Sequence, residues 1–243
     1  MNKFNIIKLS TVDSTNDYLL SLRESNIFSE GLVVVSDYQT HGKGQYDNKW
    51  LSKKGENLLV SVLLEPKINI NHQFDICKLA SLSIVDLLSS IYINSKVKWP
   101  NDIIVNNQKI SGILINNLIK KNTIIYSVIG FGLNVNQLLF DNYCIDPTSI
   151  FLETKRKFKI DYILEKLLVH LNRNEVLLNN RDQLDQKYVS KLYNRDIVSE
   201  YQSNSVKFKG TIIGIDDQGF LLIKKEDNVV YKFNAKEIKT IIK

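Results

Sequence analysis

Hydrophobic positions recur with two different periods along the chain, and the two periods predict two kinds of element. Apolar runs bounded by polar turn residues are typical of β-strands. Such runs occupy residues 6–9, 32–38, 58–64, 103–105, 113–115 and 123–129. Apolar residues at three- and four-residue spacing predict helices at residues 74–93 and 161–178, with shorter helices at 18–22, 148–152 and 183–192. The pattern therefore indicates an α+β protein.

The pattern of apolar and polar residues changes near residue 195. Short strands follow one another at residues 206–215, 219–223 and 229–233, with a turn at 216–219. This spacing predicts a small β-barrel, so we expect two domains, at residues 1–194 and 195–243. The second holds 9 basic and 7 acidic residues, within a net charge of +6 for the whole chain. The basic excess is therefore spread out, which disfavours nucleic acid and allows a small anionic ligand.

Several classes of protein are disfavoured by composition. No apolar run is long enough to cross a bilayer, and Lys3 and Lys8 interrupt any signal-peptide core, so we expect no membrane association. Cys77 and Cys144 lie far apart and are expected to be free, buried thiols in a reducing, cytoplasmic compartment. The three histidines are too scattered to predict a metal cluster: His41, His72 and His170.

The most informative stretch is a predicted hairpin whose turn is Asn106-Asn107. Its first strand follows Lys98-Trp99-Pro100-Asn101-Asp102, with the proline at the mouth of the hairpin. Lys109 lies on the return strand, and Gly112 removes a side chain three residues later. A lysine, a carboxylate and an amide beside a glycine would let a charged ligand approach the backbone closely.

A second candidate site is the loop that follows the strand at 32–38. The loop contains Gly42, Lys43 and Gly44. Its backbone amides can surround an anion, and the lysine adds a positive charge. Because the loop leads to Trp50 and not to a helix, the dinucleotide-binding fold is a poor fit.

These motifs together resemble those of biotin protein ligases, which activate biotin with ATP and transfer it to a lysine of a carrier protein. The sequence K-W-P-N-D followed by K-x-x-G is similar to their central motif. Ser14-Thr15-Asn16, the glycine loop and G-x-G-x-N-V at 130–135 resemble three further motifs of the family. The resemblance spans essentially the whole chain. It implies a mixed-sheet catalytic domain packed with helices, followed by an SH3-like C-terminal barrel.

The glycine loop departs from the family pattern G-R-G-R-x-G-x-x-W. Lys43 and Gln45 stand in place of its two arginines, and Asp47 stands in place of its third glycine. Lysine keeps the charge but loses the bidentate fork of arginine, and glutamine keeps only a neutral donor. We therefore expect weaker retention of the acyl-adenylate than an arginine-rich loop would give.

The resemblance also implies roles for individual residues. Lys109 is expected to be catalytic at the biotin carbonyl and the α-phosphate, with Asp102 oriented toward it. Biotin is expected to contact Ser14, Thr15, Asn16, Gln39, Lys43, Gly44, Gln45, Lys109 and Gly112. The nucleotide is expected to contact Gly42, Lys43, Trp50, Lys98, Asn101, Asp102 and Asn134. Mg²⁺ is the expected companion of ATP, and the sequence assigns no ligands to it.

The implied partners are biotin, ATP and a biotin carboxyl carrier domain such as that of acetyl-CoA carboxylase. The first motif lies near residue 13, so we expect a short form without an N-terminal DNA-binding domain and no binding to DNA. A lipoate or octanoate ligase or transferase, whose fold is related, is the nearest alternative. A nucleic-acid-binding module is a more distant one. The sequence leaves the oligomeric state open, a homodimer included.

Overall fold

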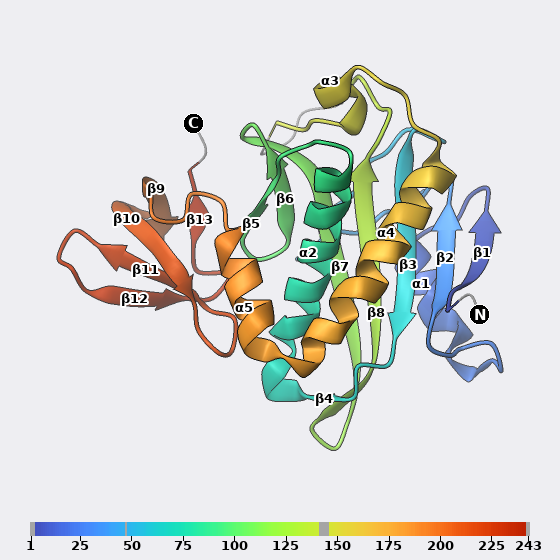
Figure 1. The fold of residues 1–243 in the computed structure, drawn as a ribbon, viewed down its shortest axis with the longest axis horizontal. Helices are drawn as coiled ribbons and strands as arrows, with labels where there is room; N and C mark the ends of the chain where they lie inside the picture. Colours follow the sequence, from blue (N-terminus) through green and yellow to red (C-terminus); the bar gives the residue numbers. More distant parts are fainter. Residues whose placement is uncertain (1–2, 47, 141–145, 242–243) are drawn as a thin grey trace.

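A mixed β-sheet forms the centre of the protein in a computed structural model that describes residues 3–46, 48–140 and 146–241 (Figure 1). Its strand order is β1-β2-β3-β8-β7-β6-β5. The strands are β1 (Asn5–Leu9), β2 (Leu32–Ser36), β3 (Asn57–Leu64), β5 (Lys96–Lys98), β6 (Asp102–Val105), β7 (Gln108–Lys120) and β8 (Thr123–Asn134). The short β4 (Ile68–Asn69) pairs with β8. Only β1 and β2 pair in parallel; the other strand pairs of this sheet are antiparallel.

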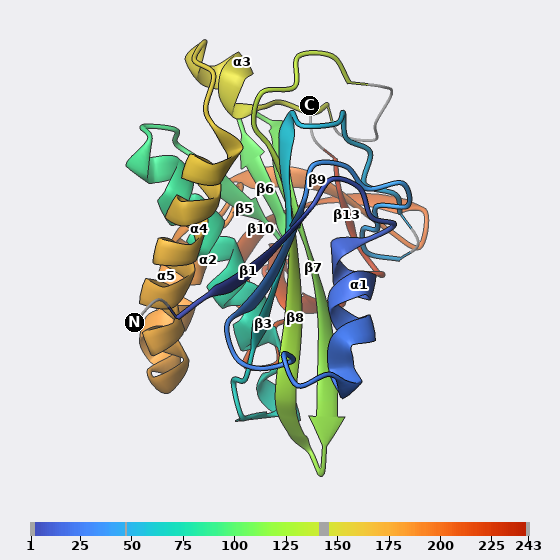
Figure 2. The same cartoon turned by 90° about the vertical axis from the view of Figure 1, so that its right-hand side faces the viewer.

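Helices cover the two faces of the sheet unequally (Figure 2). One face carries α2 (Phe74–Ser90), α4 (Ile160–Glu175) and α5 (Arg181–Ser190). Among the described helices, the two-turn α1 (Thr15–Ser21) is the one that lies on the other face. In the described part of the chain, the remaining helices are α3 (Ile150–Thr154) and 3₁₀ turns at Leu22–Glu24, Ile70–His72 and Val176–Asn179. Because the α1 face is only partly covered, it has room for a ligand site beside α1.

The principal core lies between the sheet and helices α2, α4 and α5. Helix α2 is buried nearly all round, because it packs against the sheet on one side and against α4 and α5 on the others. Helix α4 is amphipathic and buries one apolar stripe, as its helical spacing predicts. All eight residues of β3 are buried, which explains its almost unbroken apolar sequence.

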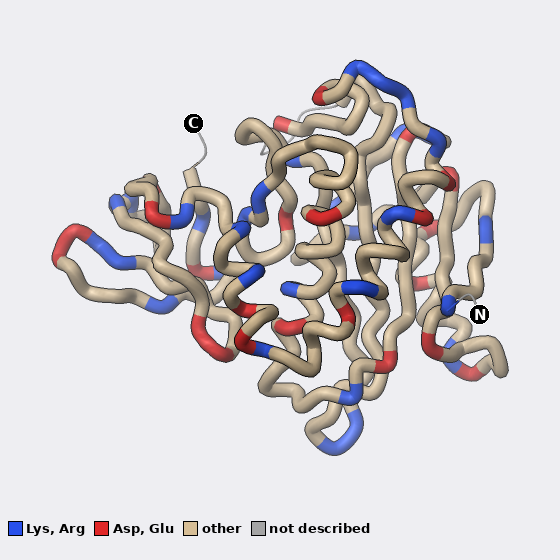
Figure 3. The backbone as a smooth tube through the Cα atoms, in the orientation of Figure 1, with Lys and Arg blue, Asp and Glu red and all other residues tan. Residues whose placement is uncertain are grey.

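The C-terminal residues form a separate five-stranded antiparallel sheet, as predicted. Its order is β12-β11-β10-β9-β13, from β9 (Val198–Ser203), β10 (Val206–Ile215), β11 (Leu221–Lys225), β12 (Val230–Phe233) and β13 (Lys239–Thr240). Within the described residues no pairing joins β12 to β13, so the predicted barrel is open between these two strands. Basic and acidic residues are interspersed over both parts of the molecule in the view of Figure 3. The domain boundary at residue 195 stays a prediction.

Several predicted elements have different bounds in the structure. The apolar runs at 113–115 and 123–129 are segments of the longer strands β7 and β8, joined by a turn in which Lys121 and Asn122 have positive φ. Strands β5 and β9 were not predicted, because their half-buried, polar-rich sequences carry little apolar signal. Helix α2 ends at Ser90 rather than at residue 93.

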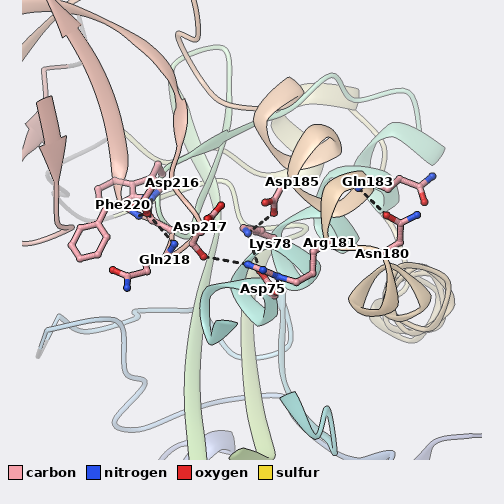
Figure 4. Close-up of polar contacts among 12 residues, drawn as sticks. Asp75, Lys78, Asn180, Arg181, Gln183, Asp185, Asp216, Asp217, Gln218 and Phe220 are labelled. Carbon is pink, nitrogen blue, oxygen red and sulfur yellow. Dashed lines mark hydrogen bonds and ion pairs between the residues drawn. The ribbon is translucent and has the colours of Figure 1, made fainter. Parts of the chain in front are cut away.

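Ion pairs join α2 to α5, and a hydrogen bond from Arg181 joins α5 to the turn between β10 and β11 (Figure 4). The Lys78 side chain is fully buried; its Nζ lies 2.8 Å from Asp75 Oδ1 and also pairs with Asp185. Arg181 donates to Asp75 Oδ2 at 2.8 Å and to the carbonyl of Asp217 at 3.3 Å. These bonds tie the C-terminal sheet to the helices of the first domain.

We expect Lys78→Ala to lower the free energy of unfolding by about 3–5 kcal/mol, because it leaves the buried Asp75 without one of its cationic partners. Lys8→Ala is the matched control, since Lys8 and Asp161 form an exposed ion pair and its loss should cost at most about 1 kcal/mol. Urea unfolding followed by circular dichroism measures both. Equal effects of the two substitutions would contradict this assignment.

Candidate functional site

A cavity of about 480 Å³ lies where the start of α1, the loop after β2 and strands β6, β7 and β8 meet. Of the fifteen residues predicted for the site, all but Gly42 and Asn134 line it. Those present are Ser14, Thr15, Asn16, Gln39, Lys43, Gly44, Gln45, Trp50, Lys98, Asn101, Asp102, Lys109 and Gly112. Segments as distant in sequence as residues 14 and 112 therefore converge on one site.

One end of the cavity is cationic. Lys109 Nζ lies 2.5 Å from Asp102 Oδ1, and Lys98 Nζ lies 3.8 Å from Asp102 Oδ2. Burial lowers the pKa of Lys98 below its ordinary value of 10.5, although the attraction of Asp102 opposes this shift. Two ammonium groups around one carboxylate leave a net positive charge, which suits an anion.

A bulge in β7 creates this arrangement. Residues three apart on a regular strand point to opposite faces, so Lys109 and Gly112 would be separated by the sheet. The register shifts between Ile103 and Ile104: Ser111 pairs with the first and Lys109 with the second, leaving one extra residue on β7. A methyl group placed on Gly112 would lie 3.4 Å from Lys109 Nζ. The bulge thus brings the lysine and the glycine to the same cavity.

The middle of the cavity is apolar and is formed by an indole ring over glycines. Gly112 on β7 pairs with Gly132 on β8, and the Trp50 ring packs against both. A methyl group at Gly132 would lie 2.4 Å from Trp50 Cε2. Lys109 Nζ is 5.8 Å from the centre of the same ring, within reach of a cation–π interaction. We did not predict that Gly132 makes space for the Trp50 ring, because the sequence G-x-G also fits a glycine bulge at the end of a strand.

The other end of the cavity carries neutral hydrogen-bonding groups. Ser14 Oγ accepts from the backbone N–H of Asp17 and so caps α1. Thr15 donates from its backbone N–H and its hydroxyl to Gln39 Oε1, at 2.7 and 3.0 Å. Asn16 fits against the sheet because Gly130 has no side chain; a methyl group there would lie 2.7 Å from Asn16 Oδ1. These residues act as a helix cap and as a cavity wall together.

The glycine loop folds into a small hairpin beside the cavity. The backbones of Lys43 and Lys49 pair in an isolated antiparallel β-bridge. The backbone N–H of Trp50 donates to the carbonyl of Gly42 at 2.9 Å. The Lys43 ammonium lies 2.6 Å from Asp17 Oδ2 on α1. Gly42 lines a neighbouring cavity of about 750 Å³, which shares Lys43, Gly44 and Trp50 with the first. Asp47 lies outside the described residues.

The segment before β6 is held from the side of the helices. Trp99 belongs to the core, and its Nε1–H donates to the carbonyl of Gly219 in the C-terminal sheet at 2.9 Å. The carbonyl of Pro100 accepts from the Tyr188 hydroxyl at 2.9 Å and from the Cys77 thiol at 3.1 Å. Trp99 is therefore a core residue, whereas Trp50 is a wall of the cavity.

Three further predictions concern residues away from the cavity. Asn134 is buried at the end of β8, where its Nδ2–H donates to the carbonyl of Thr148 at 2.9 Å; its nucleotide contact stays a prediction. Cys77 is free and buried, as predicted, and burial raises the pKa of its thiol to about 12. Cys144 lies outside the described residues.

The described part of the chain contains no group of three His, Cys, Asp or Glu side chains placed to hold a metal ion. Asp102 is the only carboxylate among the described residues that line the cavity. A divalent cation carried in by phosphate groups needs few protein ligands, and one carboxylate fits that requirement. None of the described helices is long and apolar enough to span a membrane.

Comparisons with known proteins place these features in context. Residues 9–134 match the biotin/lipoate A/B protein ligase family, and residues 202–241 match the biotin protein ligase C-terminal domain. The bifunctional ligase/repressor of Bacillus spizizenii is 26% identical over 236 residues, covering 95% of this chain and 72% of the relative. The human biotin–protein ligase is 32% identical over 219 residues, 82% of this chain and 29% of the relative.

A solved structure is similar over nearly its whole length. The biotin protein ligase from Aquifex aeolicus in complex with biotin and ATP superposes with a TM-score of 0.80 at 26% identity. The superposition covers 98% of this chain and 99% of the Aquifex chain. The arrangement of a mixed sheet and a C-terminal β-domain is therefore shared with that protein.

We expect Gly132→Ala to displace the Trp50 ring into water and to shift its fluorescence to longer wavelengths. The chain has two tryptophans, so both proteins should carry Trp99→Phe to isolate the Trp50 signal. Thr123→Ala, nine residues away on the same strand, is the control and should leave the emission unchanged. An unchanged emission maximum in the Gly132→Ala protein would show that Trp50 does not rest on this glycine.

Proposed function

The chain belongs to the biotin/lipoate A/B protein ligase family, and we propose that it uses ATP to join biotin to a lysine of a carrier protein. The observation that carries the proposal is the order of chemistry along the cavity. Neutral hydrogen-bonding groups at Ser14–Asn16 suit a urea ring, and the Trp50–glycine bed suits apolar rings and methylenes. Lys98 and Lys109 at the opposite end suit a carboxylate and a phosphate.

In the first step a biotin carboxylate oxygen attacks the α-phosphorus of ATP. The bond between the α-phosphorus and the bridging oxygen breaks, giving biotinyl-adenylate and pyrophosphate. Both reactants are anions, so the step needs positive charge where they meet. Lys109 supplies that charge with its orientation fixed by Asp102 at 2.5 Å, and Lys98 adds a second positive charge on the other side of Asp102.

In the second step the amine of the carrier lysine attacks the acyl carbon, and AMP leaves with the electron pair of the broken C–O bond. The attacking amine must lose a proton, and Asp102 is the carboxylate that the cavity offers to accept it.

Mg²⁺ bound to the ATP phosphates in the first step would neutralise part of their charge, with Asp102 as its protein contact. The carrier proposed is a biotin carboxyl carrier domain such as that of acetyl-CoA carboxylase, in the cytoplasm.

The contacts of the glycine loop support the expectation that the adenylate is held weakly. Lys43 takes the place of an arginine in the family pattern, and its ammonium is already paired with Asp17. An anion must compete with that carboxylate for Lys43, and lysine offers no bidentate fork. Early release of the adenylate is the expected consequence.

Label exchange between pyrophosphate and ATP tests the substrate directly. Biotin should support exchange, whereas lipoate and octanoate should not, because neither has a urea group for the neutral end of the cavity. Exchange with lipoate and none with biotin would assign the chain to the other branch of the family.

Lys109→Ala should slow adenylate formation by roughly 100- to 1000-fold, because it removes a positive charge at the reacting phosphate. Lys120→Ala, at the exposed end of the same strand, should have no effect. Single-turnover formation of biotinyl-adenylate measures the rate. Near-normal turnover without Lys109 would remove this residue from the mechanism.

The affinity for ATP should fall as the pH rises toward 10. Lys98 is charged below its pKa, and burial has lowered that pKa, so its charge is lost at a lower pH than for an exposed lysine. Lys98→Arg keeps the charge throughout this range and should give a flat profile. The KM for ATP between pH 7 and pH 10 distinguishes the two proteins, and parallel profiles would exclude a role for the Lys98 charge.

A further inference from the structure

Ser61 is a polar residue in the middle of the buried central strand β3. Four of the five residues at 59–63 are leucine or valine, and the Ser61 side chain is fully buried. A buried hydroxyl is costly unless it forms hydrogen bonds. Ser61 does not line the cavity, and none of the motifs found in the sequence includes it.

The Ser61 hydroxyl contacts two residues that do line the cavity. Its Oγ lies 2.8 Å from Thr15 Oγ1 and 2.6 Å from Asn16 Oδ1. Both partners are buried at the start of α1, on the neutral end of the cavity. Ser61 therefore holds Thr15 and Asn16 in place without itself lining the cavity.

The number of hydroxyl hydrogens determines which group donates and which accepts in these contacts. Ser61 has one hydroxyl hydrogen, and both of its partners here are oxygens that accept from it. The Thr15 hydroxyl hydrogen goes to Gln39 Oε1 at 3.0 Å, and Asn16 Oδ1 has no hydrogen, so the Ser61 hydrogen is shared between Thr15 Oγ1 and Asn16 Oδ1. Thr15 Oγ1 therefore accepts from Ser61 through one lone pair and keeps the other open to accept from a ligand N–H.

The chain of hydrogen bonds continues beyond Asn16. Its Nδ2–H donates at 3.0 Å to Oδ1 of Asn116, an exposed residue of β7. The Asn16 amide is thus fixed at its oxygen by Ser61 and at its nitrogen by Asn116. A cyclic urea offers one carbonyl acceptor and two N–H donors, so it is recognised only where the protein groups have fixed polarity.

We propose that Ser61 is a positioning residue that sets the hydrogen-bonding polarity of Thr15 and Asn16 and thereby the affinity for a urea-bearing acid. This inference rests on the proposed function, in which that end of the cavity receives the ureido ring. Ser61 acts through Thr15 and Asn16 and takes no part in the reactions at Lys109. It should therefore affect binding of the acid and leave the chemical step unchanged.

The test uses the full chain and biotin alone, measured by titration calorimetry. Ser61→Ala should weaken binding about tenfold, the effect of one lost buried hydrogen bond. Asn116→Ala, at an exposed position, should weaken it several-fold. Ser127→Ala is the matched control: Ser127 is fully buried on β8 and donates to Asn117 Oδ1 at 2.7 Å, away from the cavity. Its affinity for biotin should equal that of the wild type.

Steady-state kinetics separate positioning from a general structural effect. Ser61→Ala should raise the KM for biotin about tenfold while kcat and the KM for ATP stay as in the wild type. A fall in kcat with an unchanged KM for biotin would overturn the proposal, as would wild-type affinity of Ser61→Ala for biotin. If Ser61→Ala does not fold, the folded Asn116→Ala protein decides, and wild-type affinity there overturns the proposal. Failure of the wild type itself to bind biotin would instead reject the proposed function.

Discussion

The bulge in β7 is the constraint on which the site depends. It shifts the pairing of β6 with β7 between Ile103 and Ile104, and so brings Lys109 and Gly112 to one side of the sheet. Lys109 then reaches Asp102 across the hairpin, and the glycine leaves space beside the ammonium group. Without the extra residue the lysine would point toward α2 and into the core. The one extra residue in β7 is therefore what places Lys109 at the cavity and not in the packed core.

The unequal covering of the sheet explains why the cavity lies where it does. Three helices bury the opposite face and supply most of the apolar packing, so the α1 face is not needed to complete the principal core. Glycines at 112, 130 and 132 then remove side chains from that face of two adjacent strands. The space they leave is taken by an indole from one loop and an amide from α1. Stability and ligand binding are thus assigned to different faces of one sheet.

The C-terminal sheet contributes to the site indirectly. Its β10–β11 turn accepts a hydrogen bond from Trp99 and one from Arg181, which is itself paired with the buried Asp75. Trp99 and Pro100 directly precede Asn101 and Asp102, so these contacts restrain the segment that carries the Asp102 carboxylate. The second domain therefore stabilises the position of a motif that belongs to the first.

The sequence alone predicted most of the elements and the chemistry that we propose. Apolar periodicity located α2, α4 and the buried strands, and the motifs at 14–16, 98–102 and 109–112 identified the residues that now line the cavity. These signals are local, because side-chain type and spacing within one element carry them. Tertiary structure decided the bulge at β7, the pairing of Gly112 with Gly132 and the contact of Ser61 with residues 15 and 16. Each of these depends on the register between strands or on packing between segments far apart in the chain, which no short stretch of sequence specifies.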